Sequence, residues 1–118
     1  MGVARFLRER NPKVQIVAVE PRNSAALLGR EPGLHQIQGI GDGFVPEVVD
    51  KNMIDIVMTV SDDDAVQTAR DMARKEGLLV GTSTGANVWC AAHFADGRRS
   101  VVTILPDRAE RYFSTTLI

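Results

Sequence analysis

The sequence has little cysteine and few aromatic residues, and it lacks a long apolar run. Its one cysteine, Cys90, excludes a disulfide framework within the chain and a metal cluster built on cysteines. No apolar run approaches the roughly 20 residues that span a bilayer, and charges begin at Arg5, so no secretory signal is visible. These features predict a cytoplasmic protein with no membrane partner, either an enzyme or a binding domain.

The chain also lacks an excess of charge of either sign. It carries 14 lysines and arginines against 15 aspartates and glutamates, and the basic residues are spread along its length. This pattern excludes nucleic-acid binding driven by electrostatics and a polybasic membrane anchor. The hydrophobic fraction of 44% is typical of a soluble globular protein, and 118 residues are enough for one domain.

No set of side chains has the spacing of a metal site. His35 falls in a loop and His93 in a helix, and neither supports a metal site. The acids at 62–64 are consecutive and therefore point in different directions from a helix start. The sequence predicts no metal ligands.

Short runs of aliphatic residues alternate with helical patterns along the chain. Strands are expected over 14–19, 54–60, 78–80 and 101–105, and helices over 3–10, about 24–28, 62–75 and 84–95. Buried strands separated by helices form a parallel sheet with right-handed crossovers. The sequence therefore predicts an α/β fold of three layers, with a parallel sheet of about four strands flanked by helices.

The helix predicted over 62–75 has clear start and stop signals. Ser61 precedes it as the expected N-cap, and acidic residues fill its first turn. Gly77 follows it and is expected to end it. This helix is the best-defined element of the pattern.

The most informative stretch is residues 78–87, Leu-Leu-Val-Gly-Thr-Ser-Thr-Gly-Ala-Asn. A short apolar run stops at Gly81, and a turn of small residues leads into a helical pattern. Ligands bind at the carboxyl ends of parallel strands, and a helix start presents free N–H groups. Ser83 can therefore cap the helix or contact a ligand, and the local pattern favours the cap.

A second candidate is the loop 38–44, which has glycines at three alternate positions. Such a loop either brings the backbone close to a ligand or crosses the surface. It fails the dinucleotide fingerprint, because it does not follow a predicted strand and open a helix. Glu20, at a strand end, is similar to the acid that binds ribose in dinucleotide domains, but no glycine-rich turn precedes it. A role in ending the strand is favoured, and a nucleotide-binding domain built on Glu20 and residues 81–85 stays an alternative.

Two further groups have structural explanations. Trp89 and Cys90 lie in the middle of a predicted helix, so core packing is their expected role. Residues 107–111 form a charged turn, in which Arg111 and the following Tyr112 could brace a site.

Taken together, the segments resemble the C-terminal part of cysteine synthase (O-acetylserine sulfhydrylase), a pyridoxal-phosphate enzyme of the tryptophan-synthase-β fold type (fold type II). The resemblance runs along nearly the whole chain. The segments that carry it are 2–7, 17–21, 32–44, 76–86, 104–107 and 110–115.

The resemblance implies roles for particular residues. In the family, the first serine of the Gly-x-Ser-Ser-Gly-Ala turn hydrogen-bonds the pyridine nitrogen of the cofactor, and this serine matches Ser83. Thr84 stands where the family usually has serine, and Asp42 stands where alanine is common. The family segment that lines the active-site entrance matches Gln38, Gly39, Ile40 and Gly41.

The resemblance also implies what this chain lacks. The family's Schiff-base lysine, its substrate loop and its phosphate cradle belong upstream, and the first predicted helix has no strand before it. We therefore expect residues 1–118 to form the C-terminal part of the large domain, with no catalytic residue of its own and no activity alone.

The implied reaction replaces the acetyl group of O-acetylserine with sulfide in cysteine biosynthesis. A homo-oligomer is the implied assembly, and the tail of serine acetyltransferase is a partner only of a complete active site. The alternatives are a truncated relative that acts as a binding or complementation module, and a fragment of an enzyme similar to cystathionine β-synthase. Acetylserine and phosphoserine both stay open as the donor.

Overall fold

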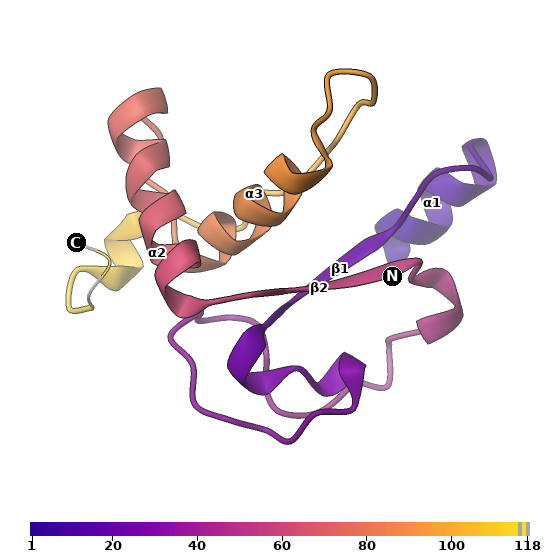
Figure 1. Ribbon diagram of the computed structural model, residues 1–118, viewed down its shortest axis with the longest axis horizontal. Helices are drawn as coiled ribbons and strands as arrows, with labels where there is room; N and C mark the ends of the chain where they lie inside the picture. Colours follow the sequence, from indigo (N-terminus) through magenta and orange to yellow (C-terminus); the bar gives the residue numbers. More distant parts are fainter. Residues whose placement is uncertain (116, 118) are drawn as a thin grey trace.

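The computed structural model describes residues 1–115 and 117. Two strands and three α-helices make up its regular part (Figure 1). In chain order these are α1 (Gly2–Arg10), β1 (Val17–Pro21), β2 (Ile56–Val60), α2 (Asp62–Asp71) and α3 (Thr82–Phe94). Short 3₁₀-helices lie at Arg22–Ser24, Ala26–Leu28, Lys51–Met53 and Ala109–Tyr112, and a π-helical turn, Met72–Glu76, extends α2.

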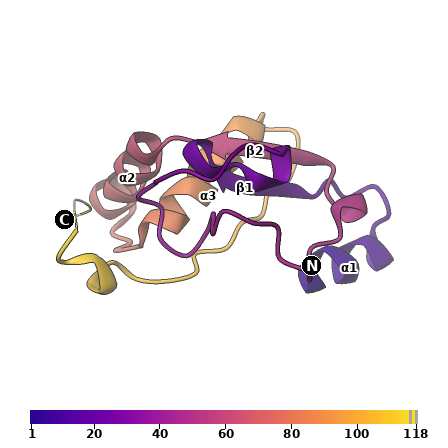
Figure 2. The same cartoon turned by 90° about the horizontal axis from the view of Figure 1, so that it is seen from below.

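β1 and β2 form a parallel pair, with Val17 opposite Ile56 and Pro21 opposite Val60. α3 packs against these strands, and α2 packs beside α3 (Figures 1 and 2). The predicted α/β class with a parallel sheet and flanking helices is therefore confirmed.

The predicted number of strands is wrong for the described part of the chain. Residues 78–80 and 101–105 form no strand there, and Val80 makes only an isolated antiparallel bridge with Arg108. A strand needs a neighbouring strand to pair its N–H and C=O groups. These two apolar runs have the composition of buried strands, but no described residues lie alongside them in ladder geometry.

α2 and the π-helical turn that extends it begin and end where the sequence predicts. The Ser61 hydroxyl accepts a hydrogen bond from the Asp64 N–H at 3.1 Å, which satisfies one of the free donors of the first turn. Gly77 ends the helical segment with φ +69°, a left-handed conformation that glycine adopts without steric cost. The one difference is the π-helical geometry of the last turn.

The buried core sits at the carboxyl ends of the two strands. Both strands are only half-buried in their first three residues, whereas Glu20, Pro21 and Val60 are buried. One core cluster joins the loop after β1 to β2, α2 and α3, and its buried members are Ile37, Val60, Ala65, Ala86 and Cys90. The core therefore fixes the start of α3 at the edge of the sheet where strands end.

In the part of the chain that the structure describes, no helix is both long and apolar enough to cross a membrane. The same residues contain no cluster of three or more potential metal ligands.

Candidate functional site

The turn before α3 places Ser83 inside the helix and not at its cap. α3 begins at Thr82, so the N-cap position belongs to Gly81, which has φ −79° and ψ 173°. The local expectation that Ser83 caps the helix is therefore wrong. The physical reason is that the helix begins two residues earlier than the pattern suggests, and Gly81 brings no side chain to its start.

The first turn of α3 holds buried polar groups without partners. Thr82, Ser83 and Thr84 are all buried, and the hydroxyl oxygens of Thr82 and Thr84 have no hydrogen-bond partner among the described residues. The described residues likewise supply no acceptor for the Ser83 hydroxyl or for the three backbone N–H groups of this turn. A buried helix start without acceptors is costly unless a ligand or water supplies them.

Asp107 and Tyr112 pack against Gly81 from the other side of the turn. A Cβ atom on Gly81 would overlap the carboxylate of Asp107 and the ring of Tyr112. The Tyr112 hydroxyl donates a hydrogen bond to Asp107 Oδ2, while Asp107 Oδ1 has no partner among the described residues. Burial, and next the hydrogen bond to Asp107, raise the pKa of Tyr112 to about 12.

The backbone ties the same segments together. The Gly81 N–H donates to the Asp107 carbonyl at 3.4 Å, and the Ala109 N–H donates to the Leu79 carbonyl at 3.2 Å. Sequence reasoning treated residues 107–111 as a charged turn and considered Tyr112 a possible brace. It missed Asp107. The available signal was the position of Pro106 and Asp107 directly after an apolar run, which matches the position of Gly81 after 78–80.

The loop 38–41 lies against the same core cluster as α3. Ile37 is fully buried beside Ala86, and Ile40 packs against this cluster, whereas Gln38 and Gly39 are exposed. Gly39 and Gly41 have φ values of +88° and +69°, which L-residues with side chains rarely adopt. The structure therefore brings the loop 38–41 and α3, which begins directly after Gly81, into contact with one core cluster.

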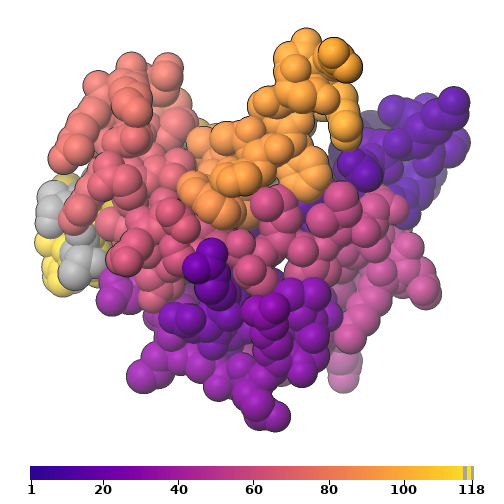
Figure 3. All heavy atoms as spheres, in the orientation of Figure 1, coloured from indigo at the N-terminus to yellow at the C-terminus, as the bar shows by residue number. Residues whose placement is uncertain are grey.

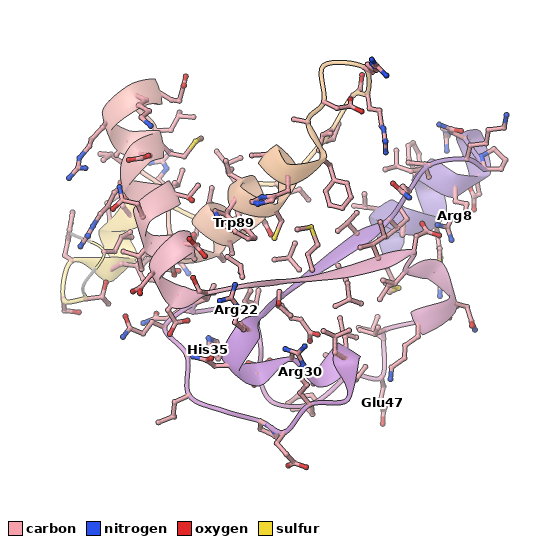
Figure 4. All side chains as sticks on the ribbon, in the orientation of Figure 1. Arg8, Arg22, Arg30, His35, Glu47 and Trp89 are labelled. Atoms are coloured by element: carbon pink, nitrogen blue, oxygen red, sulfur yellow. The ribbon has the colours of Figure 1, made fainter. Side chains whose placement is uncertain are left out.

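His35 was considered isolated from the sequence, but it is engaged on both sides. Its ring contacts the Gly41 carbonyl through Nε2 at 2.9 Å and the Ile37 N–H through Nδ1 at 3.1 Å. A Cβ atom on Gly41 would meet both His35 and Pro21, so the imidazole lies close to the end of β1 (Figure 4). No sequence pattern pointed to this role, because it depends on how the loop folds back.

Glu20 is buried and its carboxylate is already used within the chain. Its two oxygens accept hydrogen bonds from the N–H groups of Leu27 and Leu28, at 2.9 and 3.3 Å. This arrangement stabilises the chain where it leaves β1, in line with the expected structural role. It counts against a carboxylate that is free to bind a ribose.

Cys90 belongs to the core, as expected. Burial raises the pKa of its thiol to about 11, which keeps it protonated and unreactive at neutral pH. Trp89 is half-buried, packs against the same cluster, and lies 4.0 Å from His93 between ring centroids.

An apolar groove of about 260 Å³ lies away from Ser83. It runs between α2 with its π-helical turn and the segment 109–113, and its lining includes Ala69, Ala73, Leu79 and Phe113. It carries none of the unpartnered polar groups of the turn. The candidate site is therefore the start of α3 and not this groove.

The fold and the turn define an α/β protein that presents a helix start and buried hydroxyls at the carboxyl edge of a parallel sheet, the usual place for a polar ligand. The chain belongs to the pyridoxal-phosphate dependent enzyme family, whose family model matches residues 1–107.

Its similarity to cysteine synthases extends along nearly the whole chain. A cysteine synthase B of Campylobacter jejuni is 50% identical over 120 residues, which cover 98% of this chain and 39% of that protein. A solved cysteine synthase from Entamoeba histolytica superposes with a TM-score of 0.95 at 38% identity, over 98% of this chain and 36% of that one. The resemblance to cysteine synthases is confirmed, and the chain spans about two fifths of the length of this curated relative.

An enzyme with a different name is similar to a comparable degree. An O-acetylserine dependent cystathionine β-synthase from Helicobacter pylori superposes with a TM-score of 0.87 at 43% identity, over 98% of this chain and 39% of that one. The fold and the family are therefore shared by enzymes with different products.

Proposed function

We propose that this chain is the C-terminal part of a cysteine synthase, and that the start of α3 forms one wall of its pyridoxal-phosphate site. The reaction proposed for the complete enzyme replaces the acetyl group of O-acetylserine with sulfide. The observation that carries this proposal is the buried first turn of α3, whose hydroxyl and N–H groups have no partner among the described residues. The similarity to the Campylobacter jejuni protein supports the choice of reaction.

The residues present fit the cofactor chemically. When bound, pyridoxal phosphate supplies a conjugated ring that takes up the electron pair of a bond broken at the substrate. The Ser83 hydroxyl is a neutral donor and acceptor at a buried helix start, suited to a hydrogen bond with a pyridine nitrogen. Because it is neutral, it does not enforce protonation of that nitrogen, and the ring stays a moderate electron acceptor, which suits elimination and replacement at the β-carbon.

Gly81 and its neighbours would keep this wall in place. The Asp107–Tyr112 pair fills the space beside Gly81, and the two backbone hydrogen bonds noted above hold the turn against residues 107–109. The resemblance to the family implies that the loop of Gln38, Gly39, Ile40 and Gly41 would line the entrance. The packing of Ile40 against the same core cluster as α3 is compatible with that role.

We infer that the chain alone is inactive. Among the residues described, Lys75 forms an ion pair with Asp71 at 2.9 Å, and Lys51 lies in an exposed 3₁₀-helix. Lys13, exposed in the turn after α1, is the remaining lysine. None of them lies in the segments that form the start of α3.

The first test is a reduction experiment on the pure chain. The chain is mixed with pyridoxal phosphate, reduced with borohydride and mapped by peptide analysis, and no single lysine should be labelled preferentially. One specifically labelled lysine would contradict the inference, because it would mean that this chain forms its own covalent anchor. Sulfide-dependent cysteine formation by the pure chain would contradict it equally.

The second test is a chimera of this chain with the remaining part of the Campylobacter jejuni cysteine synthase B. The folded chimera should bind pyridoxal phosphate and form cysteine from O-acetylserine and sulfide. Ser83→Ala should lower its activity by roughly tenfold or more, because a hydrogen bond in a buried site is lost, whereas the exposed Ser100→Ala should not. A folded chimera that binds the cofactor without forming cysteine would contradict the proposed reaction.

The similarity to the Helicobacter pylori enzyme supports one alternative, a synthase that adds a thiol amino acid in place of sulfide. The chimera separates the two when it is given O-acetylserine with sulfide and homocysteine in competition. A complementation module without catalysis is the remaining alternative. It would bind the other part of the enzyme and yield a folded but inactive assembly.

A further inference from the structure

We infer that His35 is a positioning residue that clamps the loop 38–41 in one conformation. The inference rests on the proposed role of this loop at the active-site entrance. The clamp itself is a property of this chain, and it can be measured without cofactor or substrate.

The two contacts of His35 determine the tautomer of its ring. Its Nδ1 lies 3.1 Å from the Ile37 nitrogen, and because a backbone N–H can only donate, Nδ1 must accept and carry no proton. In a neutral imidazole the proton is then on Nε2, which lies 2.9 Å from the Gly41 carbonyl and donates to it. One side chain therefore holds both ends of the segment between Ile37 and Gly41.

The loop is also held from outside by close packing. Gly41 has φ +69°, and a Cβ atom there would lie 2.8 Å from His35 Nε2 and would collide with the ring of Pro21. Pro21 is the buried last residue of β1. The clamped loop thus lies directly against the carboxyl end of a strand.

The clamp is coupled to the proposed cofactor wall through the core. Ile37, whose N–H bonds to His35, is fully buried in the same cluster as Ala86, which lies three residues after Ser83 on α3. Gly39 and Gly41 adopt conformations with positive φ, and glycine leaves such conformations readily when nothing holds it. Without the imidazole, we expect residues 38–41 to reorient while the core and α3 stay folded.

The tautomer gives a direct spectroscopic test on the ¹⁵N-labelled chain. At neutral pH, long-range ¹H–¹⁵N spectra should show His35 with a protonated Nε2 and a bare Nδ1. A protonated Nδ1, or a ring averaged between tautomers as at an exposed histidine, would overturn the inference.

Hydrogen exchange on variants tests the positioning role. In His35→Ala, the Ile37 amide and the neighbouring amides of 38–41 should exchange roughly tenfold faster, the effect of losing hydrogen bonds of ordinary strength, while the amides of β2 change little. The matched control is His93→Ala, since His93 also bonds a carbonyl, that of Trp89 at 2.8 Å, but on α3 and away from the loop. Equal acceleration in β2 and the loop, or none in the loop, would overturn the inference.

Two conservative variants separate the halves of the clamp. The His35→Asn side chain can replace Nδ1 and should keep protection at Ile37 alone, whereas His35→Gln can replace Nε2 and should restrain Gly41 alone. If neither variant recovers any protection, a specific clamp is excluded. Failure of the proposed function is seen separately, in a chimera that forms no cysteine although the isolated chain shows the His35 signature.

Discussion

At the scale of single residues, the molecule is distinguished by polar groups that are buried around one glycine. Gly81 has Asp107 and Tyr112 on one side and the hydroxyls of the α3 turn following it. Only the Tyr112–Asp107 contact is satisfied within the described chain, while the hydroxyls of Thr82 and Thr84 are left without partners. The one tyrosine of the chain therefore supports the turn, whereas the hydroxyls of Thr82 and Thr84 have no hydrogen-bond partner among the described residues.

The Tyr112–Asp107 bond should contribute measurably to stability. Tyr112→Phe leaves the half-buried Asp107 carboxylate without its donor, so we expect the free energy of unfolding to fall by about 1–3 kcal/mol. The measurement is denaturant unfolding of the two proteins under identical conditions. Phe113→Leu is the control, because Phe113 is 67% exposed and its loss should matter little. Equal stability of Tyr112→Phe and the parent would show that the bond contributes nothing.

The same group predicts a loss of stability at alkaline pH. The pKa of Tyr112 is raised from 10.0 to about 12 in the folded chain, so its contribution is complete below pH 10 and is lost as the pH rises toward 12. Unfolding measured across this range should show the parent losing more stability than Tyr112→Phe. Parallel pH curves for the two proteins would contradict the assignment.

At the scale of elements, the close approach of α2 and α3 sets the position of the proposed site. A Cβ atom on Gly85 would overlap the carbonyl of Ala65, and Ala65 and Ala86 are both fully buried at this contact. α3 can lie this close to α2 only because small residues occupy its first turns. This packing fixes the position of Ser83 at the carboxyl edge of the sheet.

Gly85→Ala should therefore destabilise the chain although alanine favours helices. The new methyl group forces α2 and α3 apart, and we expect a loss of about 1–3 kcal/mol in the free energy of unfolding. Gly2→Ala in α1 is the matched control, because nothing lies within 4 Å of the Cβ position there. Thermal unfolding by circular dichroism measures both, and an unchanged midpoint for Gly85→Ala would show that the helices separate freely.

At the scale of the whole molecule, the chain leaves much apolar surface uncovered. Its radius of gyration is 14.5 Å, above the value of about 13.5 Å expected for a compact domain of this length. Figure 3 shows the end of the α2 segment and the end of α3 with its following loop projecting separately, with a hollow between them. Large apolar side chains are exposed on several elements, among them Val3, Phe6, Leu79, Val102, Ile104 and Phe113.

Such a surface should drive association in solution. Exposed apolar patches and unpaired strand edges favour contacts between copies, so we expect the purified chain to form dimers or larger assemblies at micromolar concentration. Light scattering over a dilution series is the measurement, and the apparent mass should rise with concentration. A monodisperse monomer at every concentration would contradict this expectation.

Much of the fold could be predicted from local pattern, because the deciding forces are local. The helix from Asp62, its Ser61 cap and its Gly77 stop follow from side-chain chemistry within a few residues. The runs 78–80 and 101–105 were expected as strands and are not, because a strand depends on a neighbour that no local pattern can supply. The cofactor contact of Ser83 and the entrance role of residues 38–41 stay predictions.

The sequence by itself determined the α/β class, the parallel pairing of its strands and the presence of a helix that starts within a few residues of Gly81. Its motifs were sufficient for the family as well. The tertiary structure alone decided that Gly81 and not Ser83 caps α3, that Tyr112 and Asp107 close around that glycine, and that His35 joins Ile37 to Gly41. Secondary-structure propensities and sequence motifs act over a few neighbouring residues. Hydrogen bonds and packing between distant segments exist only when the fold brings those segments together.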